Sequence, residues 1–122
     1  MAVVYTSGTL SLAALEYFVH VELPDSPADL VAVAADIPDD VTRTELGVAR
    51  LPATWRTFPA PEFLAHLGTS WVVSGRSAVL LVASALIPQE WKYLLNPAHP
   101  EFRRIRIRRP EPFRFDRRMW KR

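Results

Sequence analysis

A single carboxylate stands in a largely apolar stretch near the start of the chain, VVYTSGTLSLAALEYFVH, at residues 3–20. Glu16 falls among helix-forming residues, and its neighbours one helical turn away are apolar: Leu12, Ala13 and Val19. A carboxylate on such a face is costly unless it is exposed, paired or functional. A functional one could stabilise a developing positive charge or take up a proton. An exposed or Arg-paired side chain and a site carboxylate both stay open from this pattern.

Three further polar residues lie where an element is expected to end or break. Tyr5 ends a strand-like run, where a side chain can line a pocket mouth, although an ordinary half-buried strand tyrosine fits equally well. Ser84 interrupts the most apolar run of the chain, where backbone hydrogen bonds usually satisfy a lone serine. Asn96 precedes Pro97, and an Asn-Pro turn accounts for it.

Several classes of site and location find no support in the composition. The four glycines are scattered, so no phosphate-binding loop is predicted, and the three histidines show no metal-ligand spacing. The chain has no cysteine, which excludes a thiolate nucleophile and fits a cytoplasmic protein. No basic segment precedes the first apolar run, which argues against a secretory signal. The apolar runs are short, as in residues 78–83, so no membrane span is expected.

The charge of the chain is unevenly placed, although the formal net charge is only +2. Residues 1–100 carry 5 basic and 10 acidic side chains, whereas residues 101–122 carry 10 basic and 3 acidic ones. Near Arg106, isoleucines alternate with arginines, which favours a half-buried strand with one cationic, solvated face over direct nucleic-acid binding. Only residues 117–122 resemble a loose basic tail.

The length of 122 residues and the apolar fraction of 49% are typical of one globular domain that can bury a core. The run at residues 77–86 is apolar on both faces and is therefore predicted to be a central strand. Residues 38–47 and 89–102 read as turns with at most short helical pieces. We predict a single compact α/β (α+β) domain with a mixed sheet. Its elements are strands at 2–5, 30–37, 77–86, 102–108 and 113–115, and helices at 10–20 and 61–75.

Four segments, taken in order, resemble the RES-domain family, which supplies the toxins of RES–Xre toxin–antitoxin modules. They are VVYTSGTLSLAALEYFVH, LPATWRTFPAP, LGTSWVVSGRSAVLLVASALIPQEWKYLLNPAHPEF and IRIRRPEPFRFDRR. The resemblance extends from about residue 3 to residue 118. Its most specific part is residues 83–102, which read ASALIPQEWKYLLNPAHPEF and resemble the family pattern PSALIPxExNYLLNPxHPxF.

The resemblance implies a fold related to ADP-ribosyltransferases and an activity that consumes NAD+ as a substrate, with no other cofactor. The bond between nicotinamide and ribose would be cleaved by phosphate as co-substrate or by water, or ADP-ribose would be transferred to a protein. Loss of NAD+ would arrest growth. The implied partner is an Xre-type antitoxin whose C-terminal region fills the active site. Association into a homodimer is a further option.

The resemblance also implies roles for three residues. The family's tyrosine corresponds to Tyr5 as a substrate-binding residue, its glutamate to catalytic Glu16, and its serine to Ser84, which is both catalytic and substrate-binding. The family's arginine lies in an N-terminal arm ending roughly in GGRWN, before the first strand, and this sequence begins at that strand. We therefore expect a domain without that arm, so that an inactive module that only binds the antitoxin or dimerises is an alternative. Weaker stand-ins for the arginine are Arg43, Arg50, Arg56 and Arg76.

Overall fold

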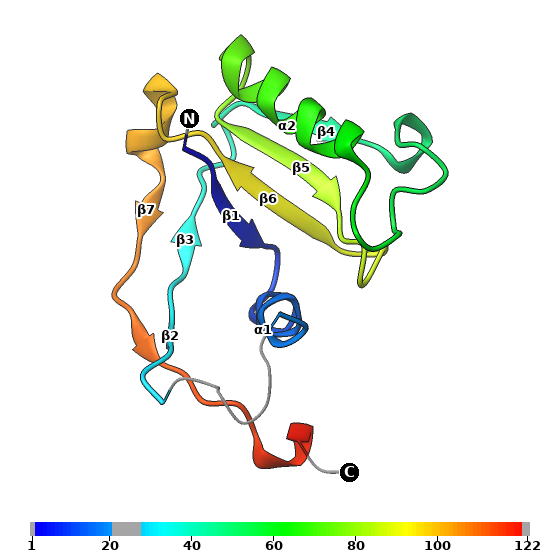
Figure 1. Cartoon of the computed structure of the whole chain (residues 1–122). Helices are drawn as coiled ribbons and strands as arrows, with labels where there is room; N and C mark the ends of the chain where they lie inside the picture. Colours follow the sequence, from blue (N-terminus) through cyan, green and yellow to red (C-terminus); the bar gives the residue numbers. More distant parts are fainter. Residues whose placement is uncertain (1, 21–27, 121–122) are drawn as a thin grey trace.

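A four-stranded mixed sheet forms the centre of the computed structural model, which describes residues 2–20 and 28–120 (Figure 1). The strands lie in the order β1-β6-β5-β4, with β5 antiparallel to β6 and parallel to β4. β1 pairs antiparallel with β6 and forms one edge of the sheet. The strands are β1 (Val4–Ser7), β4 (Arg43–Leu46), β5 (Val79–Ala83) and β6 (Trp91–Leu95).

The two faces of the sheet have different covers because successive side chains of a strand point to opposite faces. Leu80 and Leu94 pack against Trp71 of the helix α2 (Glu62–Ser74). Leu95 lies in a second apolar cluster on the other face. The members of that cluster are Val41, Ala78, Val79, Leu81, Leu95 and Ile105. The prediction that the apolar run around β5 forms a central, doubly covered strand is confirmed.

Two short ladders lie outside the four-stranded sheet (Figure 1), and Ala35 in one of them packs against the apolar cluster on the face opposite α2. One pairs β2 (Val31–Ala32) with β8 (Glu111–Pro112), and the other pairs β3 (Ala35–Asp36) with β7 (Arg106–Ile107). The predicted continuous strands at 30–37 and 102–108 are therefore wrong in part. Residues 33–34 separate two pairs of strand residues, and residues 100–104 form a 3-10 helix, η2 (Pro100–Arg104), before β7 begins.

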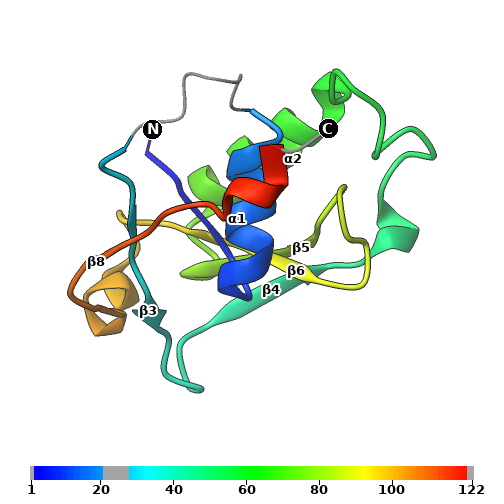
Figure 2. The same cartoon turned by 90° about the horizontal axis from the view of Figure 1, so that it is seen from below.

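The helix α1 (Leu10–Phe18) follows β1 directly, and the Thr9 hydroxyl caps it by accepting from the backbone N–H of Leu12 at 3.1 Å. Figure 1 looks along the α1 axis, and Figure 2 shows the helix from the side, in front of β5 and β6. Phe115 contacts the rings of Tyr17 and Phe18, so the C-terminal segment packs on the end of α1. Beyond it lies the 3-10 helix η3 (Arg117–Trp120), in the part of the chain where a basic tail is predicted.

Two strands of the central sheet were not predicted. β4 lies in the polar segment 38–47, and it forms the edge of the sheet, where exposed Arg43 and Glu45 alternate with half-buried residues. β6 lies in the segment 89–102, which reads as a turn between prolines, yet it pairs on both sides. The Asn-Pro turn itself is confirmed, because the Asn96 side chain accepts from the N–H of Ala98 at 3.0 Å.

A buried serine ties α2 to β4 and β5. Ser77 is 2% exposed, its Oγ accepts from Nε1 of Trp71 at 2.9 Å, and it lies 2.7 Å from Oγ1 of Thr44. Removing it leaves a buried indole N–H without an acceptor. No helix in the described ranges is both long and apolar enough to cross a membrane.

Ser77→Ala is expected to lower the free energy of unfolding by about 1–3 kcal/mol, because a buried donor loses its acceptor. Urea unfolding of the purified chain measures the change. Ser70→Ala is the matched control, since Ser70 is exposed on α2, the helix that carries Trp71, and it should change the value by about 0.5 kcal/mol or less. Equal stabilities of the two variants would contradict the role given to Ser77.

Candidate active site

The end of β5 and the last turn of α1 bring Ser84 and Glu16 together, although 68 positions separate them in the sequence. The Ser84 hydroxyl donates to Oε1 of Glu16 at 2.9 Å. Ser84 is fully buried and directly follows the last residue of β5, while the Glu16 side chain keeps 21% of its surface exposed. The buried Ser84 hydroxyl thus fixes one carboxylate oxygen of Glu16, while part of the Glu16 side chain remains exposed to solvent.

The Ser84 hydroxyl is held by the turn that follows β5. Its Oγ accepts from the backbone N–H groups of Leu86 at 3.1 Å and Ile87 at 3.2 Å. The backbone therefore satisfies this serine, as a core serine is expected to be, and the hydroxyl proton remains for Glu16. Because both acceptor positions are occupied, the direction in which the proton points is fixed.

The cation beside Glu16 is a lysine, not an arginine. Nζ of Lys92, on β6, lies 3.7 Å from Oε2 of Glu16, and 28% of the Lys92 side chain is exposed. The same Nζ lies 6.0 Å from the centre of the Tyr5 ring, within the range of a cation–π contact. We call Tyr5, Glu16, Ser84 and Lys92 the Glu16 cluster.

The register of β1 and β6 explains why Tyr5 and Lys92 meet. Ser7 lies opposite Lys92 and Tyr5 opposite Leu94, so Tyr5 and Lys92 are diagonal neighbours on the face that α2 also covers. Tyr5 is 68% exposed because β1 is an edge strand, so the alternative of a half-buried strand tyrosine is wrong. An exposed ring beside a cation and a carboxylate can stack on the flat ring of a ligand.

The four arginines considered as stand-ins are spread over the molecule. Arg56 donates through Nε to the carbonyl of Ala85, the residue after Ser84, at 2.8 Å, and so lies at the edge of the Glu16 cluster. Arg43 instead donates to the carbonyls of Val41 and Pro38. Arg50 ends the 3-10 helix η1 (Val48–Arg50), and Arg76 follows α2, at the end of β5 remote from Ser84.

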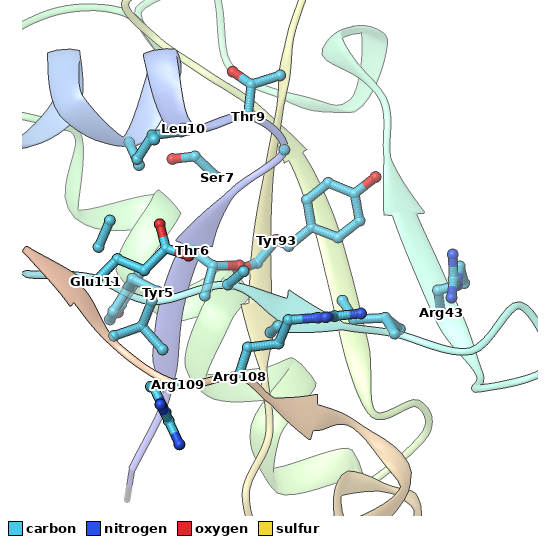
Figure 3. A pocket seen from close by; sticks show the side chains of 17 residues that line it. Tyr5, Thr6, Ser7, Thr9, Leu10, Arg43, Tyr93, Arg108, Arg109 and Glu111 are labelled. Atoms are coloured by element: carbon cyan, nitrogen blue, oxygen red, sulfur yellow. The ribbon is translucent and has the colours of Figure 1, made fainter.

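A cavity of about 550 Å³ lies beside β1, between the sheet and the segment that contains β2 and β3 (Figure 3). Small apolar side chains form part of its lining, together with Tyr93 and three arginines. Tyr93 follows Lys92 in β6 and therefore points to the opposite face of the sheet. The arginines are Arg43, Arg108 and Arg109.

The cavity and the Glu16 cluster meet at Tyr5, which belongs to both. Within the cavity, Arg108 is already paired with Asp36, with 2.6 Å between its Nε and the carboxylate, and Glu111 adds a negative charge to the lining. Glu16 and Ser84 do not line the cavity. We place the candidate active site at the Glu16 cluster, because the carboxylate, hydroxyl and cation there are in direct contact.

Sequence reasoning named three members of the Glu16 cluster and missed Lys92. The structure brings Tyr5, Glu16 and Ser84 to one end of the sheet. Lys92 was missed because β6 was not recognised as a strand. The signal was available in the sequence: in WKYLL, Lys92 alternates with bulky side chains in the period of a strand, which places it on one defined face.

The chain matches a known family and several known proteins over most of its length. The family model described as RES domain matches residues 1–116. A protein of Sphingobium sp. (strain YBL2) named "Prs ADP-ribosylating toxin" is 35% identical over 121 residues, which cover 98% of this chain and 75% of that protein. "Toxin Res" of Yersinia enterocolitica is 34% identical over 119 residues, covering 97% and 78%. "Toxin Res" of Pseudomonas putida is 32% identical over 108 residues, covering 86% and 71%.

The resemblance of the sequence and the mixed α/β fold agree with these matches. The predicted single domain with a mixed sheet is present, and the family match covers nearly all of it. The residues of the Glu16 cluster all lie inside the matched range. On this evidence the chain belongs to the RES domain family.

Proposed function

We propose that the chain is a RES-family toxin that cleaves the bond between nicotinamide and ribose in NAD+, at the Glu16 cluster. The observation that carries the proposal is the hydrogen bond by which buried Ser84 holds the partly exposed Glu16 carboxylate. A fixed, solvent-reaching carboxylate is what a reaction with a developing cation requires. The relatives named as toxins support the biological class.

The proposed step breaks the C–N bond and leaves its electron pair on the nicotinamide nitrogen, which departs neutral. The ribose carbon becomes positively charged in the transition state, and the carboxylate of Glu16 lowers the energy of that charge. An oxygen of the acceptor then forms the new bond to the same carbon. A hydrogen phosphate dianion adds without losing a proton, whereas water loses one, which Glu16 can accept. Tyr5 would stack on the nicotinamide or contact the ribose.

In the second candidate function, a protein accepts the ADP-ribose that is released from nicotinamide. The relative named "Prs ADP-ribosylating toxin" favours it, since transfer of ADP-ribose to a protein begins with the same bond cleavage. Only the acceptor differs, and the geometry of the Glu16 cluster serves both reactions. Under either function we propose a cytoplasmic toxin neutralised by an Xre-type antitoxin. An inactive module that binds the antitoxin or forms a homodimer is the alternative.

Release of nicotinamide tests the proposal. The purified chain is incubated with NAD+ alone, with NAD+ and inorganic phosphate, and with NAD+ and a cell extract. Free nicotinamide and labelled ADP-ribose on protein are measured. We expect nicotinamide in at least one arm: a requirement for phosphate identifies phosphorolysis, and label on protein identifies transfer. A folded chain that releases no nicotinamide in any arm would contradict the proposed chemistry and leave the binding module.

A further inference from the structure

The cation in the Glu16 cluster has donors left for a ligand. An ammonium group has three N–H donors, and a charge-assisted hydrogen bond to a carboxylate is about 2.7–2.9 Å long. The 3.7 Å between Lys92 Nζ and Glu16 Oε2 is longer than that, so the pair is held by charge and not by a tight hydrogen bond. With 28% of its side chain exposed, Lys92 can meet a molecule that enters from solvent.

The proposed reaction places an anion beside a carboxylate. NAD+ carries a pyrophosphate, and a phosphate acceptor would approach the same ribose carbon that Glu16 faces. Two negative groups at short distance repel each other, and the repulsion is strong where water is partly excluded. A cation in contact with the carboxylate offsets it, and Lys92 is the cation that makes this contact among residues 2–20 and 28–120.

Neighbouring groups fit a phosphate at this position. Ser7 lies directly across β1 and β6 from Lys92, so its side chain is on the same face of the sheet. Arg56 adds a second positive charge at the carbonyl of Ala85, the residue that follows Ser84. The Tyr5 ring, 6.0 Å from Nζ, forms a flat side wall. Hydroxyl and cationic donors are the usual partners of phosphoryl oxygens.

We propose that Lys92 is a substrate-binding residue that holds a phosphate group beside Glu16. The inference rests on the proposed function and adds the residue that selects for the anionic part of the reactants. The phosphate can come from two sources that share this chemistry: inorganic phosphate as acceptor, or the pyrophosphate of the dinucleotide. The lysine ammonium is a compact positive charge with N–H donors, and an arginine at the same position, which also carries a positive charge and N–H donors, can replace it in part.

Kinetics of Lys92→Gln and Lys92→Arg separate the two sources. KM for phosphate and KM for NAD+ are measured through nicotinamide release, each with the other reactant in excess. For Lys92→Gln we expect one KM to rise by about 10-fold or more, since a hydrogen bond to a charged group is lost, while kcat changes less. A rise confined to phosphate identifies the acceptor, and a rise for NAD+ with and without phosphate identifies the pyrophosphate. Lys92→Arg should restore at least part of the affinity.

Arg76→Gln is the matched control, because it removes one positive charge at the opposite end of β5. It should leave both KM values within twofold of those of the unmodified chain. Thermal unfolding of each variant shows whether it is folded. If folded Lys92→Gln keeps both KM values, or if it lowers kcat alone, Lys92 does not bind phosphate and the inference is overturned.

A binding measurement keeps this inference separate from the proposed function. The chain is titrated with inorganic phosphate and with pyrophosphate, without NAD+, and amide chemical shifts are followed by NMR. We expect shifts near Lys92 and Ser84, and at least about 10-fold weaker binding for Lys92→Gln. If the chain releases no nicotinamide but shows this difference, the proposed reaction fails and the phosphate site stands. Equal binding by both chains would reject the site even if NAD+ is cleaved.

Discussion

Glu16→Gln is expected to lower the rate of nicotinamide release by about 10²–10⁴-fold. Glutamine has nearly the same shape, and its side-chain oxygen can still accept from the Ser84 hydroxyl, which donates to Oε1 in the present structure. What disappears is the negative charge that we propose stabilises the ribose carbon, together with the group that can take a proton from water. The rate therefore falls because charge stabilisation is lost, and not because the cluster comes apart.

The control for this substitution is Glu45→Gln. Glu45 is an exposed carboxylate on β4, at the edge of the sheet away from β1, so its loss changes the net charge equally but leaves the Glu16 cluster intact. Its rate should match that of the unmodified chain. Both variants should unfold at similar temperatures. A Glu16→Gln protein that releases nicotinamide at the unmodified rate would remove Glu16 from the chemistry.

Ser84→Ala is expected to reduce both stability and activity. The hydroxyl accepts from two backbone N–H groups, of Leu86 and Ile87, and donates to Glu16, so alanine leaves two donors without their acceptor in a fully buried position. Each unsatisfied buried group costs about 1–3 kcal/mol, which sets the expected loss in the free energy of unfolding. Activity should fall further than stability explains, because Glu16 loses the hydrogen bond that orients it.

Urea unfolding and nicotinamide release, measured on the same preparation, separate these two effects. Ser11→Ala is the control, since Ser11 is exposed on α1, the helix that carries Glu16. It should leave the free energy of unfolding within about 0.5 kcal/mol and the rate unchanged. If Ser84→Ala kept full activity while losing stability, Ser84 would be a structural residue of the turn alone.

Local signals in the sequence predict the elements that carry the candidate site residues Tyr5, Glu16 and Ser84. A run of helix-forming residues predicts the helix around Glu16, and an apolar run with no preferred face predicts β5. Both signals depend on residues close together in the chain. The pairing of Glu16 with Ser84, in contrast, depends on how α1 lies against the end of β5, and no local pattern encodes that placement.

The parts that sequence reasoning missed depend on distant partners. β4 consists of Arg43, Thr44, Glu45 and Leu46, which has no strong strand signal, and it exists because β5 offers a parallel neighbour. β6 lies between turn residues and is a strand because β1 and β5 pair with it on both sides. This pairing determines the side of the sheet to which Lys92 points, and therefore its contact with Glu16. The exposure of Tyr5 likewise follows from the position of β1 at the edge.

The position of β6 within the sheet also bears on the synthesis of the protein. β1 precedes the other elements in the part of the chain that the structure describes, yet it pairs with β6, so Val4 lies opposite Leu95. A nascent chain that has left the ribosome only as far as α2 holds Glu16 without Ser84 or Lys92. Contacts between such distant segments form late in folding. The Glu16 cluster is thus completed only after residue 92 has been translated, so a shorter nascent chain lacks part of the candidate site.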